Sequence, residues 1–536
     1  MARRIFSLLF LVLVVFALVH CARRGTPSGG PKDITPAELI KATPANKSIN
    51  FKSKTIRLEF DEYIKLKDIQ KQLIVSPPLK YQPDITPQGS ASKYIEITIK
   101  DTLKPNTTYT FNFGQSIEDN NEGNPSSFLS YVFSTGDYID SLSISGVVND
   151  AFKQKVDEYV SVMLYKVDST YTDSTIYKEP PYYITNTLDS TNIFSLKNLK
   201  EGEYALFALK DEGNNNTFDQ GIDKIGFLDH YITIPTDSIY VLDLFKEVSD
   251  FSMSVPSYAS KNKIIFGYNG DGSDIEIIQK SYLPDSVKTK VTKELEKDTL
   301  NYWITPFEAD SLIFNVVSNR QKTLDTFIVK TRKLPADSLK FTAVSNKRIS
   351  LENQFWVAAN TPIKSIDTSK IKIVDKDTLP VFVPISLDTI KNRLDFDMVV
   401  PLENEYSITV LPEAITDFFN AVNDTIQYRV SFVDPTENSL LTVNLAGEVT
   451  YPVIVQLIDG SGKLVREQFA TEPKPFVYKN VKPGEYQVRV VEDTNGNQKW
   501  DTGNYLQKTF PERVSYSPAL NLRANWEETL TFQITR

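Results

Sequence analysis

The stretch that decides the fold occurs twice in this chain. Residues 194–204 read Phe-Ser-Leu-Lys-Asn-Leu-Lys-Glu-Gly-Glu-Tyr, and residues 476–486 read Phe-Val-Tyr-Lys-Asn-Val-Lys-Pro-Gly-Glu-Tyr. At the same offset, residues 211–221 align with residues 493–503. An aromatic residue, a turn carrying Gly-Glu-Tyr, a strand and an Asp/Asn-rich loop therefore recur together, which indicates a true internal repeat.

Strands dominate the rest of the sequence. Aromatic and β-branched residues alternate with polar ones in runs of about five to eight residues, and Pro, Asn, Asp and Gly separate the runs. Few stretches have a helical period. Because a domain takes about 150 residues, the 536 residues predict three to five all-β domains, each burying one face of its sheets.

The first of these units carries specific motifs. They are Thr-Pro-Ala-Asn at 43–46, Leu-Glu-Phe-Asp-Glu at 58–62, Leu-Lys-Pro-Asn-Thr-Thr-Tyr at 103–109, Ile-Glu-Asp at 117–119 with Gly123-Asn124, and Phe-Ser-Thr-Gly at 133–136. This set resembles the bacterial Ig-like domain of surface-layer and other envelope proteins, which implies a structural module. Residues 406–412 and 415–417 echo the motifs at 109–113 and 117–119, and so predict a second Ig-like domain.

Both copies of the repeat resemble the prealbumin-like sandwich of carboxypeptidase regulatory domains and of the B repeats of Gram-positive adhesins. The predicted fold class is therefore all-β: a string of Ig-like and prealbumin-like β-sandwich domains after a lipoprotein signal and tether. The predicted boundaries are 1–20 (signal peptide), 21–36 (lipidated tether), 37–140 (bacterial Ig-like domain), 141–245 (prealbumin-like sandwich), 246–334 (sandwich of unassigned type), 335–435 (Ig-like domain with a looser match) and 436–536 (prealbumin-like sandwich, the repeat of 141–245).

The N-terminus has the layout of a secretory signal. Two arginines precede an apolar run, residues 5–19, that is shorter than the ~20 residues of a bilayer-spanning helix. Cys21, the only cysteine of the chain, follows directly. This pattern resembles the lipobox of bacterial lipoproteins, although His20 stands where that family prefers a small residue. The resemblance implies acylation of Cys21 and a lipid anchor in the outer membrane of a Bacteroidetes-like bacterium, on a face that the sequence leaves open.

Composition excludes several functions. After removal of the signal, 57 Lys and Arg stand against 68 Asp and Glu, so the chain lacks the basic excess that nucleic-acid phosphates require. His230 is then the only histidine, which excludes a multi-histidine metal centre and leaves little choice of a general base. We expect no enzyme, although sequence alone leaves a glycosidase-type carboxylate pair open.

The duplicated loop is the best candidate for a metal site. In residues 493–501, oxygen donors fall at loop positions 1, 3, 5, 7 and 9, a spacing that can wrap one calcium ion. The predicted ligands are Asp493, Asn495, Asn497, the carbonyl of Lys499 and Asp501 in the second copy, and Asp211, Asn215, Asp219 and Asp223 in the first. The alternative is a tight turn built by Asx side chains, with no ion.

A short triplet recurs along the chain: Asp, then Ser or Thr, then an aliphatic residue or Thr. It resembles the O-glycosylation acceptor of exported Bacteroidetes proteins, and its excess over ordinary residue frequencies predicts partial glycosylation. The alternative is that Asp-Ser or Asp-Thr simply ends a turn before a strand. The predicted acceptors are Thr102, Ser141, Ser190, Ser238, Ser311, Ser338, Thr378, Thr389 and Thr425.

These features favour a non-catalytic lipoprotein that acts by binding. The leading hypothesis is an interaction scaffold with a protein partner in the envelope, accessory to an assembly, export or uptake machine, because rigid sandwiches present loops at fixed positions. The second is an adhesin or glycan-binding protein, for which the candidate platform residues are Tyr182, Tyr183, Trp303 and Tyr505. The alternative, which we favour for each of these four residues, is packing in a core or a turn. The third is a glycoside hydrolase. Beyond calcium, no cofactor is predicted.

Overall fold

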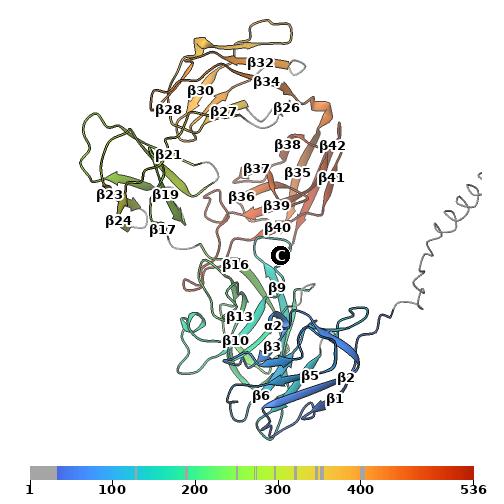
Figure 1. The fold of residues 1–536 in the computed structure, drawn as a ribbon. Helices are drawn as coiled ribbons and strands as arrows, with labels where there is room; N and C mark the ends of the chain where they lie inside the picture. Colours follow the sequence, from blue (N-terminus) through green and yellow to red (C-terminus); the bar gives the residue numbers. More distant parts are fainter. Residues whose placement is uncertain are drawn as a thin grey trace, which may run out of the picture.

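The computed structural model describes residues 33–535 except 127–128, 188–190, 249–250, 271, 273, 295–296, 319–322, 344–347, 350–354 and 399–404. The predicted signal, Cys21 and Ser190 lie outside the described residues. Nearly every regular element is a strand, so the predicted all-β fold class is confirmed. The described strands form five sandwiches that follow one another along the chain (Figure 1).

The first sandwich packs two antiparallel sheets of order β1-β2-β5-β4 and β3-β6-β8, with β7 pairing the end of β2. Its elements are β1 (Leu39–Thr43), β2 (Thr55–Leu66), α2 (Ile69–Gln72), β3 (Ile74–Ser76), β4 (Asp84–Thr86), β5 (Ser92–Thr98), β6 (Thr108–Asn112), β7 (Ile117–Asp119) and β8 (Ser130–Ser134). Ile56, Leu58 and Phe60 alternate into the core, as period-two patterning requires. Phe133 closes this core, stacked 3.8 Å from the ring of Phe51.

Asp119 explains why the motif around Gly123-Asn124 recurs in this kind of domain. Its carboxylate is buried and accepts four backbone N–H groups, from residues 121, 122, 123 and 124, at 2.6–3.1 Å. Burial raises the pKa of this carboxyl, but these hydrogen bonds outweigh burial and hold the pKa below its usual range. The turn after β7 is therefore built around one ionised side chain.

The second and fifth sandwiches share most of their strand pairing, and β14 additionally pairs β16 in the second. The second contains β9 (Leu142–Asp150), β10 (Ser161–Lys166), η1 (Thr175–Tyr177), β11 (Tyr183–Asn186), β12 (Ile193–Leu199), β13 (Gly202–Lys210), β14 (Lys224–Phe227), β15 (Ile232–Ile234) and β16 (Ile239–Lys246). The fifth contains η3 (Pro435–Glu437), β35 (Ser439–Gly447), β36 (Val453–Asp459), β37 (Leu464–Ala470), β38 (Phe476–Val481), β39 (Gly484–Glu492), β40 (Val514–Tyr516), β41 (Leu520–Leu522) and β42 (Glu527–Ile534). Each of β9 to β16 corresponds in order to one of β35 to β42, including a parallel pair of first and last strands.

The repeated motif has a local cause in both copies. Asn198 and Asn480 adopt left-handed backbone angles, with φ of 60° and 54°, and turn the chain before the Gly-Glu-Tyr segment. Asparagine tolerates this region better than residues with larger side chains. Tyr204 and Tyr486 then enter the next strand with buried rings. The recurring sequence thus fixes a turn and the first buried ring after it.

The third and fourth sandwiches complete the chain. The third has sheets of order β17-β19-β22-β21, with β18 on β19, and β20-β23-β24. Its strands are β17 (Ser252–Met253), β18 (Ser257–Ser260), β19 (Lys263–Asn269), β20 (Ile275–Gln279), β21 (Thr289–Lys293), β22 (Thr299–Ile304), β23 (Ser311–Ser318) and β24 (Thr323–Lys330). The elements of the fourth are β25 (Phe341–Ala343), β26 (Arg348–Ile349), β27 (Phe355–Ala359), β28 (Ile363–Ile366), η2 (Thr368–Lys370), β29 (Ile371–Val374), β30 (Ile385–Asp388), β31 (Arg393–Phe396), β32 (Glu405–Val410), β33 (Ile415–Asp417) and β34 (Ile426–Phe432).

The fourth sandwich repeats the strand order of the first. Its sheets β25-β27-β31-β30 and β29-β32-β34 match β1-β2-β5-β4 and β3-β6-β8, and the β28–β33 pair matches the β2–β7 pair. Asp417 stands at the end of β33 as Asp119 does at the end of β7, and it accepts the N–H groups of Phe419 and Ala421. The echo of the first domain's motifs therefore reflects the same local turn.

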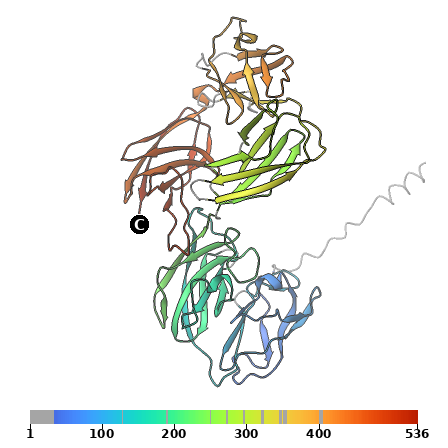
Figure 2. The ribbon, with the colours of Figure 1, turned by 90° about the vertical axis from the view of Figure 1, so that its left-hand side faces the viewer.

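The sandwiches do not form an open string. The third and fifth sandwiches lie side by side next to the second, and the fourth lies beyond both of them, so the chain folds back on itself (Figures 1 and 2). Within the described residues, no helix is long and apolar enough to cross a membrane.

The first testable prediction concerns Asp119. Asp119→Asn places an amide NH₂ among N–H groups that need an acceptor, and we expect a local loss of about 1 to 3 kcal/mol. Hydrogen–deuterium exchange of the peptide containing β7 measures the local opening, and Asp84→Asn, at an exposed side chain, is the control. Because the folded pKa is lowered, the wild type should lose protection as pH falls below about 4. The variant should lack this pH dependence, and equal protection in both proteins would contradict the prediction.

Candidate functional site

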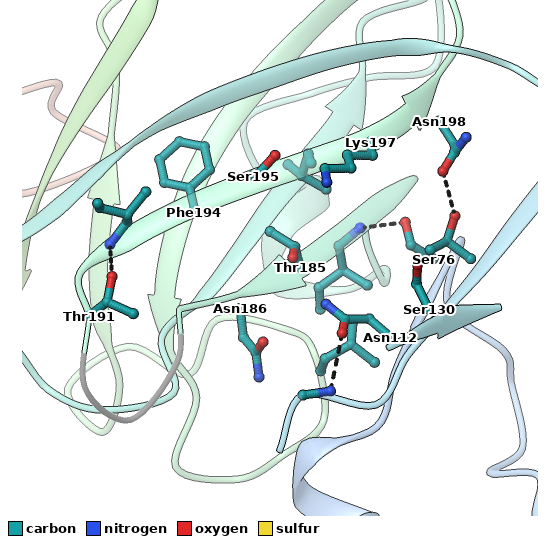
Figure 3. Close-up of a pocket in the computed structure, with 16 residues that line it drawn as sticks. Ser76, Asn112, Ser130, Thr185, Asn186, Thr191, Phe194, Ser195, Lys197 and Asn198 are labelled. Carbon is teal, nitrogen blue, oxygen red and sulfur yellow. Dashed lines mark hydrogen bonds between the residues drawn. The ribbon is translucent and has the colours of Figure 1, made fainter. Parts of the chain in front are cut away.

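A pocket of about 330 Å³ lies between the first and second sandwiches (Figure 3). Strands β3, β6 and β8 of the first domain form one side, and β11 and β12 of the second form the other. Ile74, Ile184, Phe194 and Leu196 supply apolar surface. Lys197 is the only charged residue among the sixteen that line the pocket. The pocket is thus mostly apolar, with one cationic side chain at its edge.

The junction around this pocket is hydrogen-bonded. The N–H of Ile184 donates to Ser76 Oγ at 3.1 Å, and Thr110 Oγ1 donates to Asn198 Oδ1 at 3.1 Å. The Asn198 amide also donates to the carbonyl of Asp140 at 2.8 Å. These bonds fix the two domains on either side of the pocket, which sequence analysis did not foresee because it arises only from their packing.

In the second copy of the repeated loop, backbone groups already use the predicted oxygen donors. Asp493 is fully buried and accepts the N–H groups of Asn497 and Gln498 at 3.1 and 2.8 Å. The side-chain amide of Asn497 donates to Asp501 Oδ2 at 2.7 Å, and that of Asn495 points to the same oxygen. Lys499 donates its N–H to Asn497 Oδ1 at 2.8 Å. The structure brings these residues together as a set of Asx turns.

In the first copy, the side chains of Asp211, Asn215 and Asp219 converge on Gly213. A Cβ added at Gly213 would lie 3.5–3.6 Å from an atom of each of them. Asp211 Oδ1 is a buried oxygen with no hydrogen-bond partner among the described residues. This oxygen is available as a cation ligand, whereas Asn215 presents its amide nitrogen, which donates to Asp219 Oδ2 at 3.0 Å.

Asp223 has a different role from that of an extra ligand. It is fully buried, and its carboxylate accepts the N–H of Glu212 at 2.9 Å and the N–H of Asp219 at 2.8 Å. Burial raises the pKa of Asp223, and the charges of Asp211 and Asp219 add to that effect. The carboxylate therefore braces the two ends of the loop.

Glu512 braces the second loop in the same way, although the sequence pattern did not reveal it. It accepts the N–H of Thr494 at 2.7 Å and the N–H of Asp501 at 3.1 Å, which are the same loop positions that Asp223 binds in the first copy. Glu512 lies 19 residues after Asp493 because the second loop carries an insertion before its next strand. The difference in length between the two loops was the feature of the sequence from which the counterpart of Asp223 could have been found.

Residues 502–510, which include most of this insertion, dock the fifth sandwich onto the second. The ring of Tyr505 is 1% exposed and lies edge-on to Phe207 and Phe227, with ring centroids 5.2 Å away in each case. Its N–H donates to Glu247 Oε1 at 2.6 Å and its hydroxyl donates to Asp173 at 3.1 Å. Burial raises the pKa of Tyr505, so the phenol stays neutral.

Further contacts surround this docked segment. Phe510 stacks 4.8 Å from Phe227, and Lys508 pairs with Asp173 at 2.9 Å. Nearby, the guanidinium of Arg489 lies 4.2 Å over the ring of Phe152. We call residues 502–510 the clasp, because they join the two copies of the repeat.

The predicted aromatic platform does not form. Tyr183, Trp303 and Tyr505 are 1–2% exposed, and Tyr182 is half-buried, so these rings are packing residues. Trp303 donates its indole N–H to Thr292 at 2.8 Å inside the third sandwich. A glycan that stacks on rings would need exposed faces, which these four residues do not offer.

His230 and the predicted glycosylation acceptors that the structure describes are exposed, apart from Ser311. His230 lies on the surface, with Nδ1 2.7 Å from Asp229. Among the described residues, no group of three or more His, Cys, Asp or Glu side chains is arranged to hold a metal ion. Of the predicted glycosylation positions, Ser311 is half-buried at the start of β23, and the exposed ones are Thr102, Ser141, Ser238, Ser338, Thr378, Thr389 and Thr425. Ser141, Ser238 and Thr425 also directly precede strands, as the turn alternative expects.

Calcium gives the second testable prediction. We expect calorimetric titration of the calcium-free chain to show binding in the ~0.1–1 mM range of extracellular modules, since each loop has few charged ligands. Asp211→Asn should remove the binding of the first loop, and Asp493→Asn that of the second. Asp285→Asn, in a loop of the third sandwich, is the control. A calorimetric trace without binding heat in all four proteins would leave only the Asx turns.

Comparison with known proteins agrees with the fold. Residues 33–135 match the family model described as bacterial Ig-like domain, which confirms the resemblance of the first sandwich to that domain. Comparison with curated protein sequences finds no match.

Three solved structures illustrate the likeness. The surface-layer protein SbsC, domains 1–6, is 12% identical, with 86% of this chain and 66% of that chain covered and a TM-score of 0.14. The major pilin subunit of Bacillus cereus is 11% identical, with 73% and 99% covered and a TM-score of 0.14. The Bacillus anthracis TIE protein is 12% identical, with 95% and 75% covered and a TM-score of 0.15. The chain spans slightly under two thirds of the SbsC fragment. At such low identities and TM-scores, these three matches carry no functional argument. What the comparisons establish is a bacterial Ig-like domain at residues 33–135, the first of the five sandwiches.

Proposed function

We propose that this protein is a non-catalytic scaffold of the bacterial envelope, anchored in the outer membrane by a lipid on Cys21. The observation that carries the proposal is the clasp, because it turns four of the five sandwiches into a closed ring. A ring holds its loops at fixed relative positions, and a scaffold needs this property when it engages several parts of a partner.

Contacts at two further junctions support the ring. Lys290 Nζ donates to the carbonyl of Ile363 at 2.9 Å, and the ring of Trp303 lies 6.2 Å from that of Phe419, so the third and fourth sandwiches touch. Arg348 forms a two-pronged ion pair with Glu437 at the junction of the fourth and fifth. Paired hydrogen bonds of this kind define geometry as well as energy.

The chemistry of the described surface favours binding over catalysis. The exposed His230 contacts the exposed carboxylate of the adjacent Asp229. The buried acids Asp119, Asp223 and Glu512 are all committed to backbone N–H groups. Glycans on the exposed triplets would shield the outer faces of the sandwiches and leave the junctions for partners.

The third testable prediction concerns the clasp. Tyr505→Ala removes the ring that fills the second sandwich's outer face, at a cost to docking of about 3 to 5 kcal/mol. We expect small-angle X-ray scattering to give a larger radius of gyration and maximum dimension for the variant. Trp526→Ala, at a side chain 53% exposed on the same sandwich, should scatter like the wild type. Identical scattering from all three proteins would contradict a ring held by the clasp.

The fourth prediction concerns the anchor and the partner. Acylation would consume the thiol of Cys21, so Cys21→Ser should move the protein from the membrane fraction to the soluble fraction and prevent labelling with a fatty-acid analogue. Wild-type protein purified from mildly solubilised outer membranes should carry an envelope protein in a fixed molar ratio. Membrane retention of the variant would refute the anchor, and retention on glycan beads without a protein partner would favour the adhesin.

A further inference from the structure

The outer side of β12 faces the pocket between the first two sandwiches. Val148 donates its N–H to the carbonyl of Asn192 at 2.8 Å, and the register with β9 runs unbroken from Ile193 to Lys197. In an antiparallel pair, alternate residues point their N–H and C=O groups toward and away from the partner strand. Ser195 and Lys197 therefore point their backbone groups away from β9, toward the pocket that both residues line.

The fifth sandwich shows how the same edge is closed from within. The residues that correspond to Ser195 and Lys197 are Val477 and Lys479 of β38. Gln468 Nε2 donates to the carbonyl of Val477 at 2.8 Å, and Arg466 donates to the carbonyl of Lys479. Two long side chains of β37 thus cap the outward carbonyls of β38.

The second sandwich lacks these caps. Pairing through β10 and β36 places Thr185 where the fifth sandwich has Gln468, and Tyr183 where it has Arg466. The Thr185 side chain is too short to bridge the two strands, and the Tyr183 hydroxyl accepts the N–H of Lys200 instead. Within the described part of the chain, no hydrogen bond reaches the carbonyls of Ser195 and Lys197.

We propose that this pocket takes a β-strand from a partner protein, which adds to the outer edge of β12 and carries alternating aliphatic and acidic side chains. The proposal deepens the scaffold function and rests on it, because it names the first docking site. The backbone N–H groups of the partner strand would donate to the carbonyls of β12, as the side chains of Gln468 and Arg466 donate to the carbonyls of β38 in the fifth sandwich. Strand addition to an open sheet edge is a common mode of peptide recognition.

Two features define the side chains of this strand. One face of the strand passes the half-buried Ile74, beside the buried side chains of Ile184 and Phe194, which favours aliphatic residues. The other passes the exposed Lys197, the only charged residue among the described residues that line the pocket, which favours carboxylates. The volume of about 330 Å³ is at the small end for a ligand pocket and suits a few residues of a strand. Figure 3 shows Ser195 and Lys197 on the second sandwich together with Thr185 and Asn186, and Ser76, Asn112 and Ser130 from the first sandwich.

The test uses a capped eight-residue peptide of alternating Glu and Val, labelled for fluorescence anisotropy, with the full mature chain. We expect saturable binding, and the amides of Ser195 and Lys197 should gain protection in hydrogen–deuterium exchange while those of Val477 and Lys479 do not change. Two further peptides are N-methylated at every Glu or at every Val. Because only one set of amides faces β12, one of these peptides should lose at least tenfold in affinity and the other should keep it.

Two variants locate the site. Thr185→Gln copies the cap of the fifth sandwich and should abolish binding. Lys197→Glu lies on the surface and keeps the fold, so it should weaken the Glu–Val peptide and strengthen a Lys–Val peptide of the same length. Circular dichroism and melting check that both variants fold.

Three outcomes would overturn the proposal. They are absence of protection at Ser195 and Lys197 with every peptide, equal binding of the two N-methylated peptides, and an unchanged preference in Lys197→Glu. None of them bears on the ring, which scattering of the Tyr505 variant tests separately.

Discussion

The arrangement of the sandwiches depends on one side chain of the fifth sandwich that is buried in a hydrophobic cluster of the second. Tyr505 belongs to the fifth sandwich, but its ring is buried among Phe207, Phe227 and Phe245 of the second. Gly503 makes this approach possible, because a Cβ at that position would lie 2.7 Å from the ring of Phe245. The buried carboxylate of Glu247 fixes the backbone of Tyr505, and Gln220 holds the second oxygen of that carboxylate. Apolar burial thus provides the attraction, and charged hydrogen bonds set the register.

The two copies of the repeat contain corresponding strands, but their loops and sheet edges differ. A carboxylate braces the loop in both, but it comes from Asp223 in one and from Glu512 in the other. The extra residues of the second loop carry the clasp, and the acceptor of the clasp is the first copy itself. The opposite edges differ in the same way, since Gln468 and Arg466 close β38 while β12 stays open. The fifth sandwich therefore carries the clasp, which the second lacks, and the second carries the open edge of β12, whose counterpart β38 is capped. The clasp of one copy binds the other copy.

Local patterns predicted the fold well, and packing decided the sites. The alternation of Ile56, Leu58 and Phe60, the turn at Asn198 and the echo of Asp119 by Asp417 are all written in short windows of sequence, because strands and turns respond to neighbouring residues. The contacts across the pocket join residues 88 and 108 positions apart, and a clasp contact joins residues 258 positions apart, which no local periodicity reports. The sequence offered Tyr505 as a residue of a glycan platform or, preferably, as a packing residue, and its burial agrees with packing. For the loop of Asp493, spacing alone does not separate an ion's ligands from a set of Asx turns, since both need oxygen at the same positions.

The closed ring also has a mechanical meaning. A load applied between the N-terminal domain and the fourth sandwich reaches the fourth sandwich by two routes, one through the third sandwich and one across the clasp and the fifth. Tension would divide between these parallel paths, so that neither linker carries the whole of it. The N-terminal domain stands outside the ring and carries the full tension alone. Under strain it is therefore the first domain, and the hydrogen bonds that join it to the second, that sets the strength of the whole molecule.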